Sequence, residues 1–318
     1  MTSPITEAQS GGLLGQVPAQ GGPGKKRKGK GAEEAGYDGA GGRVLNVFSH
    51  GFLAVWAIMI ILPLAWIILS SFKNNSEIGS SAWSWPSHFT FGAFGRAWDK
   101  GIGDFFLNTV IVMVFSVPLT MLFGSMVAYV LARYEFPGNR FIYFLFVGGA
   151  MFPYFLALVP LFFMVKNLGM LNTYQGLILV YVAYSLPFTT FFMHSFFKTL
   201  PTAIHEAAVL DGASHTRTFF QVMVPMAKPG LLSVGIFNVL GQWNQYILPV
   251  TLMQPQTSTD KDHSMLAQGL VNLALSQGYS GDYPALFAGM VIAMLPVLVV
   301  YLSFQRQVQA GLTAGTLK

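Results

Sequence analysis

Two short motifs have the spacing of chemical sites, but neither is surrounded by the residues that such a site needs. Residues 24–30 satisfy the GxxxxGK spacing of a phosphate-binding loop, yet Gly31 stands where Ser or Thr must bind Mg²⁺. Residues 260–263 combine two Asp with one His, which is common on exposed loops and weak as a metal site. Because the sequence also has no Cys, we expect no catalytic residue, cofactor or metal site in this chain.

Uncharged polar and aromatic side chains are stronger candidates for binding a small molecule. They gather in two apolar runs, at Tyr181, Tyr184, Ser185, Thr189 and Thr190 in one and at residues 242–246 in the other. The main candidates are Tyr184, Thr189, Trp243, Asn244, Gln245 and Tyr246. Indole and phenol rings stack on the C–H faces of sugar rings, and amides both donate and accept hydrogen bonds. We therefore expect these residues to line a path for an uncharged, polyhydroxylated solute. The alternative is that they form hydrogen bonds that hold neighbouring helices together.

The composition places these runs in a membrane. Of all residues, 53% are apolar and only 10% are charged, whereas a soluble domain has about a quarter of its residues charged. Six apolar runs are long enough to cross a bilayer, which takes about twenty helical residues. They are residues 51–69, 106–131, 141–165, 175–197, 231–253 and 284–304. The expected fold is therefore all-α and integral to the membrane, with six transmembrane helices.

Residues 1–43, before the first apolar run, differ from the rest in composition. They are rich in Gly, Ala, Ser and Pro and carry a cluster of Lys and Arg at residues 25–30. Such a segment cannot bury enough apolar area to offset chain entropy. We expect a disordered tail over residues 1–43 and a membrane domain over residues 44–318. The basic cluster suits anionic lipid headgroups better than nucleic acid, because no folded basic module accompanies it.

The distribution of positive charge predicts the orientation. With the N-terminus inside, the inner segments hold thirteen Lys and Arg residues and the outer segments hold five. The positive-inside rule then places both termini in the cytoplasm, together with the segment 200–230. Outside, the aromatic segment 70–104 is interpreted as an interfacial belt, with a substrate-contacting lid as the alternative. The polar segment 254–283 could contact an external partner.

The six runs contain no Asp, Glu, Lys or Arg in their cores. Carriers driven by an ion gradient normally need such groups inside the membrane. Since the chain also lacks a nucleotide site, active transport must draw its energy from another polypeptide. The sequence therefore favours a transport subunit that docks on a separate ATPase. The alternatives are a stand-alone channel, or a membrane enzyme, which would need a cluster of His, Asp or Glu near an interface.

The segment 200–230, between the fourth and fifth runs, is polar and interrupted. Its residue types predict two short helices with a bend, and the alternative is an ordinary connector between spans. The expected start and stop signals are Thr199 or Thr202, Gly212, Ser214, Pro225 and Pro229. Ile204, Ala207 and Ala208 recur at three- and four-residue spacing, which gives the first helix a narrow apolar face.

This segment resembles the cytoplasmic coupling loop of the inner-membrane permease subunits of ABC importers. That loop follows the pattern E-A-A-x3-G-x9-I-x-L-P, and Glu206 to Pro225 keep its spacing, with Val222 and Val224 replacing Ile and Leu. In the family, the loop docks into a groove on the ATP-hydrolysing subunit. The resemblance implies an ATPase-coupling role for Glu206, Ala207, Ala208, Asp211, Gly212 and Pro225.

Residues 44–318 as a whole are similar to carbohydrate-importer permeases of the maltose type. The stretches that carry this similarity include residues 71–73, 108–109, 128–133, 168–173, Trp243-Asn244 and 311–315. Gln245 departs from the pattern, because Glu is common there. The resemblance implies a multi-pass permease of the bacterial cell membrane that imports a sugar, or another uncharged polar solute, by alternating access. It also implies a second permease chain, an ATP-binding dimer that holds ATP and Mg²⁺, and an external solute-binding protein.

Overall fold

The computed structural model describes residues 40–257, 259–276 and 281–313, which form helices and loops without a strand. Residues 1–39 of the predicted tail lie outside this part of the chain, and α1 (Ala40–Ser70) begins within the last four residues of the tail. The chain divides into two compact units inside α1, between Ile58 and Met59. In the first unit, the side chains from Leu45 to Ile58 are all exposed, as expected for a helix whose surroundings are apolar.

In the part of the chain that the structure describes, four helices are long and apolar enough to cross a membrane, and two bent helix pairs raise the number to six if each pair counts as one span. The four are Leu45–Ser70, Gly92–Arg133, Tyr174–Thr199 and Tyr283–Gln307. They belong to α1, to the run from α3 (Gly92–Ala97) through α4 (Gly103–Arg133), to α7 (Tyr174–Thr199) and to α14 (Tyr283–Thr313). The predicted all-α membrane fold is confirmed, while the count of six spans stays a prediction.

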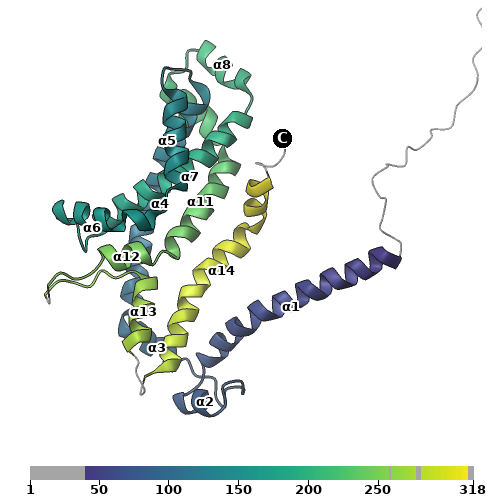
Figure 1. Ribbon diagram of the computed structural model, residues 1–318, viewed down its shortest axis with the longest axis vertical. Helices are drawn as coiled ribbons and strands as arrows, with labels where there is room; N and C mark the ends of the chain where they lie inside the picture. The colour runs from purple at the N-terminus through teal and green to yellow at the C-terminus, as the bar shows by residue number, and fades with distance from the viewer. Residues whose placement is uncertain (1–39, 258, 277–280, 314–318) are drawn as a thin grey trace, which may run out of the picture. The chain divides into compact units, whose positions relative to one another are not determined.

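The third predicted span is sharply bent. It consists of α5 (Asn139–Met151), the short η2 (Tyr154–Ala157) and α6 (Leu158–Asn167), with an angle of 91° between the two halves. Pro153 stands at the break, where its ring disfavours a helical conformation of the preceding residue. Figure 1 shows α6 turning away from the direction of α5.

The fifth predicted run, residues 231–253, is not one helix. Here α11 (Lys228–Trp243) ends at Asn244, whose Nδ2 donates to the carbonyl of Leu240 at 2.9 Å, and α12 (Ile247–Leu252) follows after a short break. Asn side chains compete with helical hydrogen bonds in this way, so the apolar run alone did not reveal the interruption. The 16 residues of α11 extend for about 24 Å.

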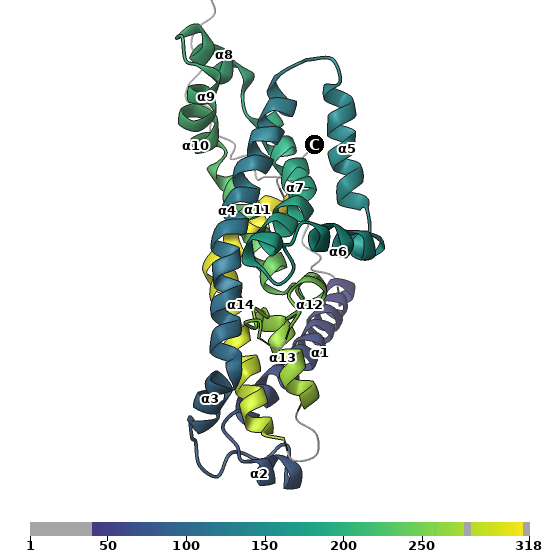
Figure 2. The same cartoon turned by 90° about the vertical axis from the view of Figure 1, so that its left-hand side faces the viewer.

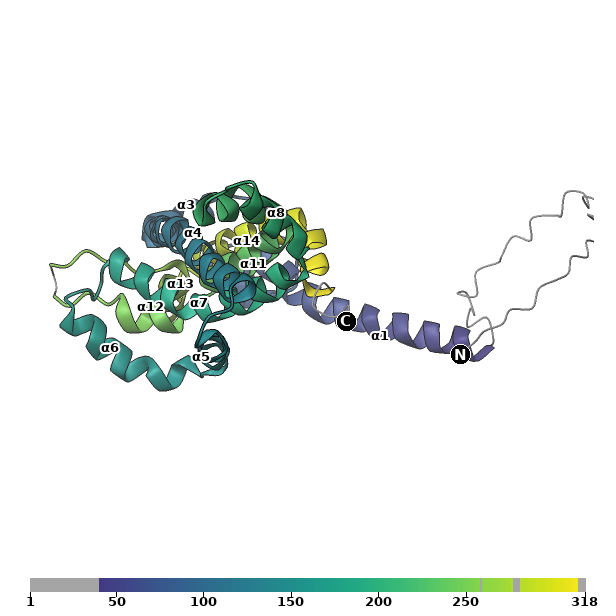
Figure 3. The same cartoon turned by 90° about the horizontal axis from the view of Figure 1, so that it is seen from above.

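The core is formed mainly by α4 packed along α7, with α5 beside α7, α11 against the pair and α14 against α11. Small residues allow the close approach: a Cβ on Gly124 of α4 would lie 2.5 Å from Cγ2 of Thr189 in α7. Figure 2 shows α4 and α7 running together, and Figure 3 shows α5 and α6 on one side of this pair and α14 on the other.

The segment 254–283 folds back into the bundle rather than lying wholly on the surface. Its helix α13 (Leu266–Ser276) packs against α4 and α14, and Ser264, Met265 and Gln268 are buried. Asn108 of α4 donates to the carbonyl of Ser264 at 3.0 Å. Polar groups of this segment therefore find partners inside the protein, as buried polar groups require.

Candidate functional site

The first helix of the segment 200–230 is α8 (Thr202–Leu210). It ends as predicted, because Gly212 has φ 78° and follows the C-cap Asp211. Its predicted start is wrong: Pro201 occupies the N-cap position and no side chain caps the helix. Thr199 instead donates to the carbonyl of Phe196 at 2.8 Å.

The second helix begins as predicted but does not stop where expected. Ser214 caps it by accepting a hydrogen bond from the backbone N–H of Arg217 at 3.3 Å. The helix then runs through α9 (His215–Arg217), η3 (Thr218–Met223) and α10 (Val224–Met226), so that Pro225 lies inside it. The π-helical turn η3 ends two residues before Pro225 and widens the helix where a proline ring would otherwise clash with the preceding turn. Pro229 lies in the first turn of α11, after a bend of 80°.

The two helices of this segment differ in burial. All nine residues of α8 are described, and none is buried. Glu206 and Ala207 are exposed, and Leu210 is 87% exposed. In η3, by contrast, Phe219 and Met223 join Tyr129 and Phe197 in a hydrophobic core cluster. The segment is thus fixed to the bundle through its second helix, while α8 stands at one end of the helices of the second unit (Figures 1 and 2) and has no buried residue.

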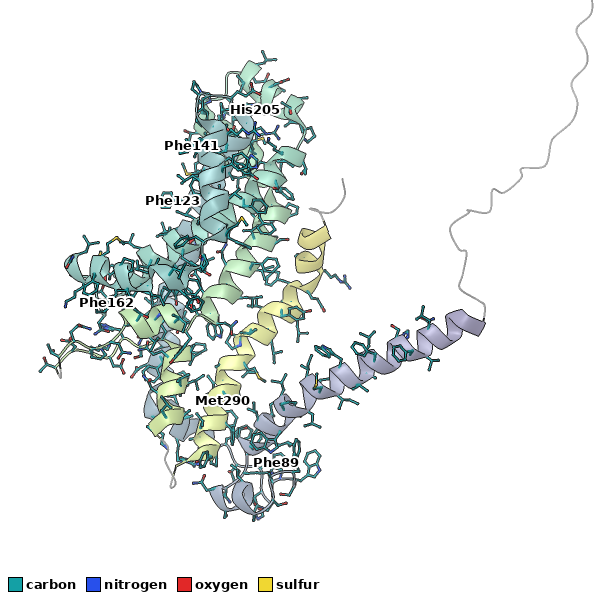
Figure 4. All side chains as sticks on the ribbon, viewed as in Figure 1. Phe89, Phe123, Phe141, Phe162, His205 and Met290 are labelled. Atoms are coloured by element: carbon teal, nitrogen blue, oxygen red, sulfur yellow. The ribbon has the colours of Figure 1, made fainter. Side chains whose placement is uncertain are left out.

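Aromatic and histidine side chains lie between α8 and the end of α4. The ring centroid of His205 is 5.7 Å from that of Tyr134 and 6.0 Å from that of Tyr129. Figure 4 shows His205 beneath α8. Burial lowers the pKa of His205, and the positive charge of Arg133 lowers it further, while Glu206 opposes the shift. The neutral imidazole is therefore the favoured form in this contact.

A cavity of about 500 Å³ lies between the bend of the α5–α6 pair and the helices α7 and α11. None of the residues that line it in the described part of the chain is charged. Its polar lining consists of Tyr154, Tyr181, Tyr184, Ser185, Asn238, Gln242 and Gln245. This volume falls within the range of small-molecule sites, about 300–1,000 Å³, and three phenol rings with three amides offer stacking and two-way hydrogen bonding.

Of the six predicted path residues, Tyr184 and Gln245 line this cavity and the other four do not. Trp243 packs against Phe106, and its Nε1 donates to the carbonyl of Ala293 at 3.0 Å. Thr189 is buried and accepts a hydrogen bond from Asn238 at 3.0 Å. Asn244 is the C-cap residue of α11, and Tyr246 lies in the break as the N-cap residue of α12. Their predicted role in the solute path is untested.

The sequence analysis missed Tyr154 and Asn238 as lining residues. Asn238, Gln242 and Gln245 follow one another at four- and three-residue spacing, which places them on one face of α11 and its end. That spacing was the available signal for Asn238. Tyr154 had no such signal, because it reaches the cavity only through the bend at Pro153.

Buried hydrogen bonds join three helices beside the cavity. Ser116 of α4 donates to Oε1 of Gln242, whose Nε2 donates to Ser185 of α7 at 3.4 Å. Gln242 of α11 therefore links α4 to α7 and also borders the cavity. A change of its partners would alter the helix contacts and the cavity wall together.

Residues 120–313 match the family described as "Binding-protein-dependent transport system inner membrane component". The matched residues include α7, the segment 200–230, α11 and α14, together with every predicted coupling and path residue. The chain belongs to this family. It is therefore a transport permease and a multi-pass membrane protein, as the sequence predicted.

Named relatives of this permease transport sugars. It is 52% identical, over 87% of its own length and 90% of the relative, to the "Diacetylchitobiose uptake system permease protein NgcG" of Streptomyces coelicolor. It is 32% identical to the "Multiple sugar-binding transport system permease protein MsmG" of Streptococcus mutans, over 86% of this permease and 98% of that protein. These matches confirm the predicted family of carbohydrate ABC importer permeases.

A solved structure has the same fold. A chain of a bacterial ABC transporter "involved in the import of the acidic polysaccharide alginate" superposes with a TM-score of 0.73 at 22% identity. The match covers 84% of this permease and 98% of that chain. At this identity, the comparison supports the fold of the permease.

Proposed function

We propose that this permease carries an uncharged di- or oligosaccharide through the cavity beside Gln242 and Gln245. The observation that supports this most is the chemistry of the lining, which offers phenol rings and amides without a charged group among its described residues. A charged solute would lose its water there without gaining a counter-charge, which is costly in a low-dielectric site. Diacetylchitobiose is the first sugar to test, because NgcG, the relative at 52% identity, is named for its uptake.

The energy for import comes from a partner ATPase that docks on α8, and the permease itself catalyses no reaction. The exposure of α8 supports this proposal, because large apolar side chains that remain exposed mark interaction surfaces. Glu206, Ala207, Ala208, Asp211, Gly212 and Pro225 belong to this contact in the proposal. ATP and Mg²⁺ bind to the partner dimer. A second permease and an external solute-binding protein complete the importer, and both termini of this chain lie in the cytoplasm.

Uptake in sealed liposomes tests the proposed solute path. The assembled importer, with ATP enclosed and the binding protein outside, should accumulate labelled diacetylchitobiose. Gln245→Ala should raise the KM or lower the rate several-fold, since one neutral hydrogen bond contributes about 1 kcal/mol. Gln254→Ala, which removes the same amide from an exposed position, should leave uptake unchanged. Equal uptake by both variants would show that Gln245 does not contact the solute. If the importer accumulated no neutral sugar, the proposed substrate class would be contradicted.

A further inference from the structure

The helix α8 contributes no residue to the hydrophobic core, and its packing against the bundle is limited to η3 and to the rings of Tyr129 and Tyr134 near His205. None of its nine residues is buried, and the nearest core cluster contains Leu200, Phe219 and Met223 but no residue of α8. The link before it is extended, with ψ 143° at Leu200 and ψ 127° at Pro201. Two extended residues between helices would act as a hinge if nothing bridged them.

Arg133, the last residue of α4, bridges this link. Its Nη2 donates to the carbonyl oxygens of Phe197 and Leu200, each at 2.7 Å. Its Nη1 donates to Oγ1 of Thr202, the first residue of α8, at 3.1 Å. One guanidinium therefore contacts the end of α7, the link and the start of α8.

The chemistry of this contact is favourable and directional. Carbonyls in the last turn of a helix have no partner within the helix, and a cation is stabilised near them by the helix dipole. The guanidinium is a rigid planar fork, so that its donors hold several acceptors in one geometry, which a Lys ammonium on a flexible chain cannot do.

The backbone that carries Arg133 is itself fixed. Nδ2 of Asn139 donates to the carbonyls of Leu131 at 3.1 Å and Tyr134 at 2.6 Å, which caps the end of α4. The hydroxyl of Tyr134 shares a hydrogen bond of 2.9 Å with Nδ1 of His215. The end of α4 thus contacts the second helix of the segment 200–230 as well as the first.

We propose that Arg133 is a positioning residue that joins α4, α7 and α8 into one rigid unit. This proposal rests on the proposed function, in which the ATPase moves α8. With Arg133 in place, a displacement of α8 moves α4 and α7 and therefore the wall of the cavity. Without it, the link at Leu200 and Pro201 has no bridge, α8 keeps only its contacts with η3 and with the rings near His205, and less of its displacement reaches α4 and α7.

The test measures sugar uptake and ATP hydrolysis by the same assembled importer in liposomes. For Arg133→Gln we expect ATP hydrolysis to continue while uptake per ATP falls about tenfold, because hydrogen bonds to a charged group are lost. Arg133→Lys should restore uptake only in part. Arg140→Gln is the control, since Arg140 is exposed and its guanidinium lies 5.6 Å from the ring centroid of Phe144. Its uptake per ATP should match the wild type.

A distance measurement separates positioning from a general loss of stability. The chain has no Cys, so spin labels at Ala203→Cys on α8 and Met126→Cys on α4, both exposed, report on the joint directly. The wild-type distance distribution should be narrow, and Arg133→Gln should broaden it. If Arg133→Gln does not assemble, the same pair is measured in Arg133→Lys, where broadening is again expected.

Two results would overturn the proposal: a distribution as narrow in the assembled variants as in the wild type, or uptake per ATP unchanged in Arg133→Gln. Either result leaves the proposed function intact if the wild-type importer transports sugar with ATP. A wild-type importer that hydrolyses ATP but moves no sugar would instead contradict the proposed function.

Discussion

The segments 200–230 and 254–283 are both polar stretches between long helices, yet α8 of the first relates to the bundle in the opposite way to the second. In the second, Leu266 and Gln268 are buried, the backbone N–H of Leu266 donates to Thr109 at 2.8 Å, and Nε2 of Gln268 donates to the carbonyl of Met253 at 3.2 Å. In the first, α8 has no buried residue and is held by Arg133 and by ring contacts.

This difference separates a structural segment from a docking segment. Where polar groups of a loop find partners inside the bundle, a substitution should reduce stability. Where a helix exposes its apolar side chains and makes few contacts with the bundle, a substitution should impair coupling to a partner and leave the fold intact. Each prediction below tests one side of this contrast.

The largest effect is expected at α8. Glu206→Lys or Gly212→Val should abolish ATP-driven uptake while the protein remains inserted and stable in detergent. A Cβ on Gly212 would meet nothing within 4 Å, so the position itself lies in open space. Its cost comes from φ 78°, which L-residues adopt at about 1–2 kcal/mol.

Gly79→Val is the control for Gly212→Val, because the surroundings of Gly79 are equally open and it has no positive φ. We expect normal uptake from this variant. Wild-type uptake by Glu206→Lys would show that α8 is an ordinary connector.

The next effect is expected in the segment 254–283. A Cβ on Gly269 would lie 2.0 Å from Cδ2 of Phe105, so that Gly269→Ala must displace packed atoms. Overpacking of this kind typically costs about 1–3 kcal/mol. The thermal unfolding temperature in detergent should fall clearly, whereas the sugar taken up per ATP by the surviving protein should stay normal. Gly95→Ala, in open space, should change neither quantity.

The smallest effect is expected at the start of α14. Arg96 donates to Asp282 at 2.7 Å, and Lys100 lies 3.2 Å from the same carboxylate. The bond from Arg96 is the main cause that lowers the pKa of Asp282 from 3.8 to about 2. A carboxyl with a lowered pKa stabilises the fold above its unfolded-state pKa, and this contribution disappears as the pH falls from about 4 to 2.

The free energy of unfolding of Asp282→Asn at neutral pH should therefore be lower than that of the wild type by only about 1 kcal/mol, because Arg96 is half exposed and water screens the pair. Thermal unfolding of the variant should also be less sensitive to pH between 4 and 2 than that of the wild type. An identical pH dependence in both proteins would show that Asp282 contributes no such stabilisation.

Local rules predicted local features of this chain well. Gly212 ends α8 and Ser214 caps α9, because both signals act within a few residues. Pro225 was misjudged because a π-helical turn accommodates it, and Asn244 interrupts an apolar run that looked continuous. The positions of the helices along the chain followed from apolar length, whereas their bends did not.

Long-range contacts were beyond prediction from one sequence. Residues 172 and 252 are far apart in the chain, yet the backbone N–H of Asn172 donates to the carbonyl of Leu252 at 2.8 Å. Nδ2 of Asn172 also donates to the carbonyl of Lys261 at 2.9 Å, which ties the segment 254–283 to the bundle. Trp243 was proposed as a path residue from its type, and its contacts with Phe106 and Ala293 depend on where α4 and α14 pass.

The most direct test of this account compares sealed liposomes that contain this polypeptide alone with liposomes that contain the complete importer. We predict that sugar accumulates against its gradient only when the ATPase partner, ATP and the binding protein are present. Accumulation by this polypeptide alone would contradict the claim that an uncharged pathway in the membrane is driven from α8 by a separate ATPase.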